Sequence, residues 1–467
     1  MKTSKKNNQQ IQTRLKSSGH QNPRALALFT LNAFHLDDIL LDTLIFNVSD
    51  QISSYDQRDR AFIHSLVYGV IRWRSYLDHI IVQLSHRPIS KIFLPILNTL
   101  RMGLFQMMFM DRIPEHAAVN TSVDLVHTFA PKYLTRFVNA VLREAVRSKD
   151  RIHIPDTTPP EPDYLSIRYA YPKWLIQRWF AYWGPDITQD LCQAGNQVPP
   201  IVLRANTLKI KRSDLIKTMA SNVQSITKTS HAPDGICVSN LKCAIGNSEP
   251  FKKGLFQVQD EAAQLIGLIV APKPGETILD ACAGRGGKTG HLAQYMNNQG
   301  LIVAVDQSKE KINILSDEMK RLGITIVSTC QHRWPKALDD RLFDRVLLDA
   351  PCSGLGVIRR HPDMKWKKTE AHIFQNAKKQ QKLLNRMAFH VKPGGTLVYC
   401  VCSFEPEETS QIVEKFLSQH INFTIDKKIH SILETFINIK GYYLFRPDIH
   451  LMDGFFAVSL IRSENQT

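Results

Sequence analysis

Two cysteines, each placed just after an apolar run, are the side chains of this chain best suited to covalent chemistry. Cys352 stands in the segment Phe-Asp-Arg-Val-Leu-Leu-Asp-Ala-Pro-Cys-Ser-Gly, and Cys402 follows fifty residues later in Leu-Val-Tyr-Cys-Val-Cys-Ser. A thiolate attacks carbon well when its surroundings favour the anion. The two thiols and the carboxylate of Asp349 could therefore share one site. The alternative is a pair of small cysteines buried in a core.

Both segments are predicted to be buried parallel strands of an open α/β sheet. Each is an apolar, β-branched run that stops at a polar turn, as strands covered on both faces do. From Leu255 to the end, such runs alternate with helical patterns, with strands expected at 277–280, 301–306, 324–327, 343–349 and 396–401. Ligands bind at the carboxyl ends of the strands in sheets of this kind. We therefore expect Asp349, Cys352 and Cys402 at one edge of the sheet.

A glycine-rich turn after the strand 277–280 predicts a cofactor site. It reads Cys282-Ala-Gly-Arg-Gly-Gly-Lys-Thr289, which lacks the first glycine of a P-loop and the last glycine of the dinucleotide fingerprint. The next strand ends at Asp306, whose carboxylate can accept hydrogen bonds from both ribose hydroxyls. The arrangement suits an adenosine ligand without phosphate, such as S-adenosylmethionine. A plain reversal of the chain is the alternative.

The residues before Leu255 divide into three parts. Residues 1–20 are predicted to be a flexible basic tail, and residues 21–150 an all-helical domain with apolar residues at helical spacing. Residues 151–254 begin as a proline-rich linker and continue as a small α+β module, which leaves 255–467 for the α/β domain. Basic residues at polar positions of the first two domains suggest contacts with phosphates. A solvated helix surface is the alternative.

The charge balance points to an anionic partner. The 59 Lys and Arg residues outnumber the 43 Asp and Glu residues, and the resulting net charge of +16 makes nucleic acid the first candidate. The eight cysteines include no Cys-x-x-Cys pair, so we expect neither a disulfide framework nor a metal site. Without a run of eighteen apolar residues or a signal-like start, the chain is expected to be cytoplasmic and free of membrane. We expect a monomer, since no sequence feature demands more.

The two cysteine segments closely resemble the motifs of the NOL1/NOP2/Sun family of RNA cytosine-C5 methyltransferases. Residues 343–354 are similar to the first motif and 397–403 to the second, while residues 23–149 are similar to a NusB-like helical domain. Arg204-Ala-Asn206 and Asp453-Gly-Phe-Phe456 match the family as well. The resemblance implies a multidomain fold. It has an all-α NusB-like N-terminal domain, a small α+β RNA-binding module and a C-terminal α/β Rossmann-like methyltransferase domain.

The resemblance also implies an activity. A methyl group would pass from S-adenosylmethionine to carbon 5 of one cytosine in 16S rRNA, with Cys402 as the nucleophile at carbon 6 and Cys352 assisting release. Asp349 would contact the polar edge of the pyrimidine or the methionine moiety. The residues expected to bind the cofactor are Cys282, Ala283, Gly284, Arg285, Gly286, Gly287, Lys288, Asp306, Gln331 and Asp349. A non-catalytic RNA-binding assembly factor and a dehydrogenase are the alternatives.

The chain departs from the family pattern in two places. The family turn is usually Cys-Ala-Ala-Pro-Gly-Gly-Lys-Thr, whereas this chain has Gly284 and Arg285 in the middle, and Gln331 stands where the family has an acid. Replacing a carboxylate by an amide at a ligand is worth about 1 kcal/mol. The departures therefore predict weaker cofactor binding.

Overall fold

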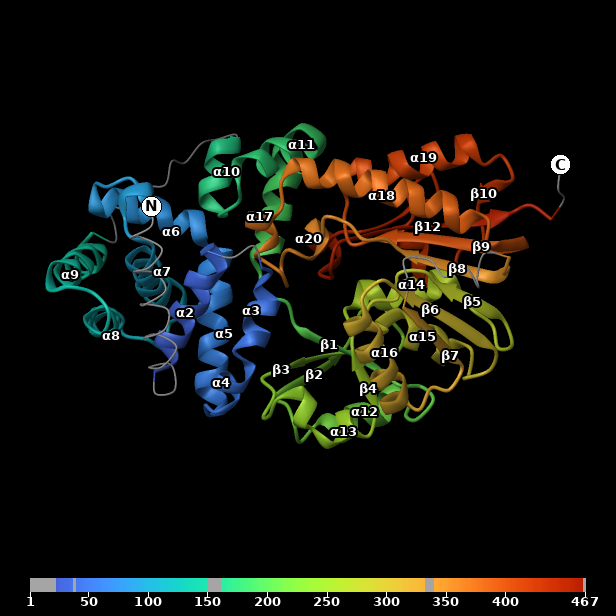
Figure 1. The fold of residues 1–467 in the computed structure, drawn as a ribbon, viewed down its shortest axis with the longest axis horizontal. Helices are drawn as coiled ribbons and strands as arrows, with labels where there is room; N and C mark the ends of the chain where they lie inside the picture. Colours follow the sequence, from blue (N-terminus) through green and yellow to red (C-terminus); the bar gives the residue numbers. More distant parts are fainter. Residues whose placement is uncertain (1–21, 37–38, 149–160, 332–339, 465–467) are drawn as a thin grey trace. The chain divides into compact units, whose positions relative to one another are not determined.

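The computed structural model describes residues 22–36, 39–148, 161–331 and 340–464, which form two compact units (Figure 1). The first unit contains the chain up to Gln197 together with His361–Lys367, and the second contains Val198–Arg360 and the chain from Lys368 onward. The predicted tail at 1–20 and the start of the predicted linker, 151–160, lie outside the described residues. The domain limits at 20, 150 and 254 stay predictions.

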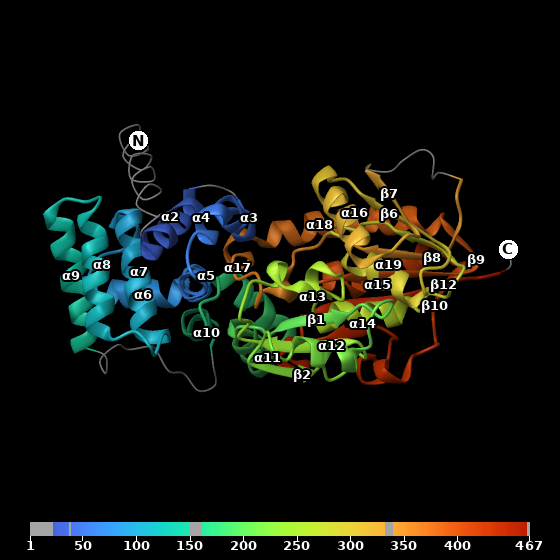
Figure 2. The ribbon, with the colours of Figure 1, turned by 90° about the horizontal axis from the view of Figure 1, so that it is seen from below.

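The described part of the first unit is all-helical, as predicted. Prolines stand at the starts of several helices, where a missing N–H costs nothing, as in α7, α8 and α9. Helices α8 and α9 lie side by side (Figure 2). The helices are α2 (Pro23–Leu36), α3 (Leu41–Asn47), α4 (Ser49–Ser53), α5 (Gln57–Arg72), α6 (Arg74–Ser85), η1 (Ile89–Lys91), α7 (Leu94–Phe109), α8 (Glu115–His127), α9 (Lys132–Arg147), α10 (Pro162–Arg168), α11 (Lys173–Asn196) and α17 (Met364–Lys367).

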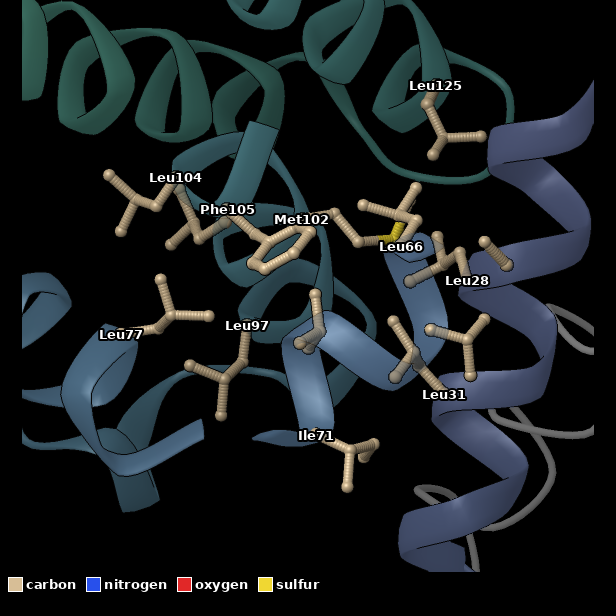
Figure 3. Packing of buried hydrophobic residues seen from close by; sticks show 14 of the residues in the cluster. Leu28, Leu31, Leu66, Ile71, Leu77, Leu97, Met102, Leu104, Phe105 and Leu125 are labelled. Atoms are coloured by element: carbon tan, nitrogen blue, oxygen red, sulfur yellow. The ribbon is translucent and has the colours of Figure 1, made fainter. Parts of the chain in front are cut away.

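The core of this unit lies among α2, α5 and α7 (Figure 3). Leu28 of α2 and Leu66 of α5 are fully buried beside Phe105 of α7. Burying each such side chain stabilises the fold by about 1.5–3 kcal/mol. A Cβ atom at Gly69 would collide with the ring of Phe105, so the close approach of α5 and α7 requires glycine at this position.

The second unit begins with the small α+β module that the sequence predicts. Its four strands are antiparallel in the order β2-β3-β1-β4, and Leu203, Leu215 and Phe256 are fully buried in its own small core. The elements are β1 (Ile201–Ala205), α12 (Arg212–Met219), β2 (Ser225–Lys228), β3 (Gly235–Ser239), η3 (Ile245–Asn247), α13 (Glu249–Lys252) and β4 (Phe256–Val258).

The rest of the second unit is built on an eight-stranded mixed sheet with the order β10-β12-β9-β8-β5-β6-β7, in which β11 also pairs with β12. Strands β5 to β9 are parallel, whereas β12 runs antiparallel to β9, β10 and β11. The strands are β5 (Thr277–Asp280), β6 (Leu301–Asp306), β7 (Val327–Gln331), β8 (Phe343–Asp349), β9 (Val391–Val401), β10 (Phe423–Ile425), β11 (Tyr443–Phe445) and β12 (Phe455–Arg462).

Helices cover both faces of this sheet (Figure 1). Ile278 and Ile302 face the side covered by α14–α16, whereas their neighbours Leu279 and Val303 face the side covered by α18 and α19. This alternation makes the buried strands apolar on both faces and confirms the predicted Rossmann-like domain. The helices are α14 (Glu261–Val270), α15 (Gly287–Tyr295), α16 (Lys309–Leu322), η5 (Leu355–Val357), α18 (Glu370–Ala388), η6 (Pro406–Glu408), α19 (Ser410–Gln419), η7 (Ser431–Phe436) and α20 (Pro447–His450).

One strand begins later than the sequence pattern predicts. Strand β7 starts at Val327, not at residue 324. The apolar Ile324 instead closes the end of α16, where Gly323 is left-handed and the N–H of Ile324 donates to the carbonyl of Met319 at 2.9 Å. None of the described helices is both long and apolar enough to cross a bilayer.

Candidate active site

Four neighbouring parallel strands end in polar side chains at one edge of the large sheet. Asp349 ends β8, Asp280 ends β5, Asp306 ends β6 and Gln331 ends β7. The register of β6 and β7 pairs Asp306 directly with Gln331. This edge therefore gathers three carboxylates and one amide, among them three residues expected from the sequence.

The two cysteines lie together beside the same edge. The register of β8 and β9 pairs Asp349 with Cys400, so the turns after these strands are neighbours. The sulfur atoms of Cys352 and Cys402 are 3.2 Å apart, and both residues are partly exposed. The hydrogen bond with Cys402 and burial hold the pKa of Cys352 well above its ordinary value. The geometry thus joins two thiols, of which Cys352 resists ionisation.

Lys288 connects the glycine-rich turn to Asp349. Its Nζ donates to Asp349 Oδ2 at 2.6 Å, and it lies 4.9 Å from the centre of the Phe455 ring. Burial alone would lower the pKa of Lys288, but Asp349 and the nearby thiols of Cys400 and Cys402 outweigh it and raise the pKa. The residue is therefore an ammonium ion at neutral pH. Burial raises the pKa of Cys400, whose sulfur lies 3.5 Å from Asp349 Oδ1.

The glycine-rich turn is hydrogen-bonded to Asp306. The N–H of Gly284 donates to Asp306 Oδ2 at 3.0 Å, and the N–H of Ser308 donates to Oδ1 at 2.8 Å. Gly286 precedes α15 with a φ of 85°, and a Cβ atom there would lie 2.8 Å from Leu315 Cγ. The turn and the strand-end carboxylate are thus fixed relative to each other.

The remaining residues expected in the turn differ in exposure. Arg285 is exposed, while Ala283 is buried and Gly287 is half-buried. Cys282 is half-buried, and burial raises its pKa to about 12. It therefore stays a neutral thiol, and the cation of Arg285 is on the solvent side of the turn.

Asp280 belongs to this edge but was not singled out from the sequence. Its Oδ2 accepts a hydrogen bond from Thr289 Oγ1 at 2.7 Å, while its buried Oδ1 has no hydrogen-bond partner among the described residues. Burial raises the pKa of Asp280 to about 7. The signal was available, because Asp280 ends its strand just as Asp306 and Asp349 end theirs.

Arg204 is a second residue that sequence reasoning did not assign to the site. This fully buried side chain of β1 donates to the carbonyl of Gly287 at 2.9 Å and to the side chains of Gln257 at 2.6 Å and Gln294 at 3.2 Å. Burial lowers the pKa of Arg204 to about 9. The small sheet therefore supports the glycine-rich turn from behind. The signal lay in the Arg204-Ala-Asn206 match.

The donor set of this edge suits an organic cation better than a metal ion or a phosphate. Carboxylates at the strand ends attract positive charge and repel phosphate. Within the described ranges, no group of three or more His, Cys, Asp or Glu side chains is arranged to hold a metal ion. Asp280 Oδ1 is a buried acceptor without a hydrogen-bond partner among the described residues.

Comparisons with known proteins agree with this geometry. Residues 267–461 match the family described as 16S rRNA methyltransferase RsmB/F, residues 21–147 match the NusB family, and residues 171–245 match the ferredoxin-like domain of RsmF/B-like methyltransferases. Among solved structures, the crystal structure of PH0851 shares 26% identity and a TM-score of 0.76, covering 94% of this chain and 98% of that one. These matches confirm the domain types expected from the sequence.

Curated relatives cover nearly the full length. A probable ribosomal RNA small subunit methyltransferase B from Synechocystis is 36% identical, over 86% of this chain and 91% of the relative. A protein of the same description from Bacillus subtilis is 32% identical, over 94% of this chain and 98% of the relative. Because this identity extends along most of this chain and most of each relative, the chain belongs to the 16S rRNA methyltransferase RsmB/F family.

Proposed function

We propose that this protein methylates carbon 5 of a cytosine in 16S rRNA through a transient bond between Cys402 and carbon 6. The observation that carries the proposal is the pair of sulfur atoms of Cys352 and Cys402, 3.2 Å apart beside Asp349. Membership in the RsmB/F family supports rRNA as the substrate. When bound, S-adenosylmethionine supplies the methyl group.

The substrate explains why a thiol is needed. Carbon 5 of cytosine is too weakly nucleophilic to take a methyl group unaided, and addition of a thiolate at carbon 6 gives it enamine character. Cys402 is partly exposed, so its sulfur is accessible to a pyrimidine ring. After methylation, loss of the carbon 5 proton and of the thiolate restores the aromatic ring.

Asp349 is suited to orient the base. One of its carboxylate oxygens is held by Lys288 at 2.6 Å, and the side chain is 31% exposed, so it can still accept a hydrogen bond from the base. The amino group of cytosine is a donor that fits this acceptor. The base must first leave the stack, because its carbon atoms are covered in folded RNA.

The cofactor is assigned to the glycine-rich turn and the neighbouring strand ends. Asp306 would accept hydrogen bonds from the ribose hydroxyls, and Gln331, its partner in the register, would contact the adenine. A dinucleotide would bring phosphates against these carboxylates, which argues against a dehydrogenase.

The helical domain is assigned to the RNA backbone. Lys132, Arg136 and Arg143 of α9 are exposed at helical positions four and seven residues apart, so they share one face of the helix. Cations spaced along a helix face can contact successive phosphates, and such binding weakens steeply with salt. This assignment is consistent with the net charge of +16.

The central test replaces the nucleophile. Cys402→Ala should abolish transfer of label from S-adenosylmethionine to unmodified 16S rRNA, while RNA binding persists, because the alanine cannot add to carbon 6. Cys243→Ala is the matched control, since it removes another partly exposed thiol from the small module. Turnover by Cys402→Ala at the wild-type rate would refute the assignment. A wild-type protein that binds RNA but transfers no label would favour the assembly factor.

The companion test addresses the second thiol. If Cys352 assists elimination, Cys352→Ala should retain the RNA as a covalent adduct, because Cys402 can still attack but leaves slowly. The adduct should survive denaturation and appear as a band of reduced mobility on a gel. Adding Cys402→Ala to this variant should remove the band. A variant that turns over without adduct would show that Cys352 has no part in release.

A further inference from the structure

The two cysteines of the site are separated by a short movement from a covalent bond. Their sulfur atoms are 3.2 Å apart, whereas a disulfide places them at about 2.0 Å, so the pair must close by roughly 1.2 Å. A rotation of each side chain about its Cα–Cβ bond can supply this movement. The distance alone therefore permits Cys352 and Cys402 to join.

The backbone around the pair is already drawn together. The N–H of Ala350 donates to the carbonyl of Cys400 at 2.9 Å, and the N–H of Gly356 donates to the carbonyl of Cys402 at 3.0 Å. These two hydrogen bonds tie the turn after β8 to the turn after β9 both before and after Cys352. The sulfur atoms can therefore join without a rearrangement of either turn.

A buried carboxylate fixes the residues directly after the two cysteines. Ser353 donates from Oγ to Glu408 Oε2 at 2.6 Å and from its backbone N–H to Glu408 Oε1 at 2.8 Å. Ser353 Oγ also lies 3.3 Å from Ser403 Oγ, and all three residues are fully buried. This bridge holds the two chain segments at a constant spacing beside the sulfur atoms.

Both cysteines are also accessible to a small oxidant, because each is partly exposed. A peroxide converts an isolated thiol into a sulfenic acid and then into a sulfinic acid, which thiol reductants do not reverse. A second thiol beside the first captures the sulfenic acid as a disulfide, which they do reverse. The neighbouring thiol thus decides between permanent and reversible oxidation.

We propose that Cys352 and Cys402 form a site of reversible oxidative modification, at which a peroxide produces an intramolecular disulfide. The thiolate of one cysteine attacks a peroxide oxygen, the O–O bond breaks, and the leaving hydroxide takes up the proton that the thiol released. The second thiol attacks the sulfenic sulfur, the S–O bond breaks, and a second water leaves with the remaining proton. Each sulfur loses one electron, and the peroxide gains both.

The modification has a consequence for the proposed function, on which this part of the inference rests. A disulfide occupies the sulfur of Cys402, so that it cannot add to carbon 6 of cytosine until the bond is reduced. It also protects that sulfur from sulfinic acid formation. Formation of the disulfide itself depends only on the geometry of the free protein, so it can be measured without RNA or cofactor.

The first test treats the reduced full chain with hydrogen peroxide and maps the thiols by mass spectrometry. We expect the peptides that contain Cys352 and Cys402 to become linked, with the loss of two hydrogen atoms, and to separate again with a thiol reductant. Cys243, a partly exposed thiol of the small module, should remain unlinked in the same molecules. Peroxide-treated protein with Cys352 and Cys402 unlinked, or linked only between molecules, would overturn the proposal.

The second test removes the partner thiol. In Cys352→Ala, peroxide should carry Cys402 to the sulfinic acid, so the fraction of free Cys402 thiol recovered by reductant should be at least about fivefold below that of the wild type. Cys243→Ala is the matched control, because it removes a thiol outside the pair and should keep the wild-type recovery. Equal recovery in the two variants would overturn the proposal.

The third measurement separates the modification from the proposed activity. Transfer of methyl label by the wild type should fall at least about tenfold after peroxide and return to within about twofold after reduction. A linked protein that still transfers label at the original rate would refute the role of Cys402 as nucleophile. A protein that forms the linkage but methylates nothing even when reduced would refute the activity alone.

Discussion

Two clusters of carboxylates in the second unit differ in how completely they are paired. Asp260 and Asp453 bind two arginines: Arg359 Nε and Arg360 Nε donate to the two oxygens of Asp453 at 2.8 and 2.7 Å, and Arg360 Nη2 donates to Asp260 at 2.5 Å. At the strand ends, by contrast, one buried oxygen of Asp280 has no hydrogen-bond partner among the described residues, so this cluster is open. The charges of the closed cluster are paired with each other, whereas those of the open cluster are only partly paired.

The contacts of the closed cluster show which part of the chain it stabilises. Asp260 caps α14 by accepting from the N–H of Ala262 at 3.0 Å, and its Oδ1 also accepts from the N–H of Asp453 at 3.0 Å. Nearby, the N–H of Gly356 donates to the carbonyl of Cys402 at 3.0 Å. The cluster therefore anchors the chain that leaves the Cys352 turn. It supports the open site without taking part in its chemistry.

The largest effect is expected from breaking the closed cluster. Asp453→Ala removes a carboxylate partner from the buried Arg359 and from the partly exposed Arg360, and should lower the free energy of unfolding by about 3–5 kcal/mol. Glu249→Gln breaks the exposed pair with Lys252 and should change little. Denaturant unfolding of both variants and of the wild type measures these changes in the free energy of unfolding. Equal stability of the two would remove the distinction between closed and open clusters.

A pH effect is expected from the open cluster. Burial raises the pKa of Asp280 to about 7, from an unfolded value of 3.8, so the folded protein holds a proton that the unfolded chain has lost. The contribution of protonated Asp280 to stability is then fully present below the unfolded pKa, and it is lost as the pH rises through 7. Between pH 4 and pH 8 the free energy of unfolding should therefore fall by on the order of 2–4 kcal/mol more in the wild type than in Asp280→Asn.

Hydrogen exchange in β5 and β6 measures this difference at the two pH values. Asp317→Asn, on the exposed face of α16, should retain the wild-type pH dependence. If Asp280→Asn retains it as well, the open oxygen carries no strain, and the two clusters are more alike than their geometry suggests.

The smallest effect is expected at the edge of the open cluster. Gln331→Glu restores the acid that the family pattern has at this position, and should tighten S-adenosylmethionine by about fivefold to tenfold, or about 1 kcal/mol. Titration calorimetry gives the dissociation constants. Gln299→Glu adds the same charge at an exposed position outside the site and should have no effect. Weaker binding by Gln331→Glu would mean that repulsion from Asp306 prevails.

Local patterns were sufficient where one segment alone decides the structure. The strands at 277–280, 301–306 and 343–349 form as predicted, because an apolar run bounded by turns has few other ways to be buried. The sequence pattern wrongly placed Ile324 in a strand, because its position at the end of α16 depends on the left-handed conformation of Gly323. The antiparallel strand β12 could not be predicted, since its pairing with β9 joins distant segments.

The sequence by itself determined the chemistry of this protein: two Cys-Ser turns after apolar runs, a glycine-rich turn and carboxylates at strand ends. These features depend on residue type and short spacing, which the chain displays directly. Only the tertiary structure decided which groups act on each other. Glu408 meets Ser353 across 55 residues, Arg204 meets Gly287 across 83, and Asp453 meets Asp260 across 193. Such partners are selected by packing and by the need to satisfy buried polar groups, and no local pattern records them.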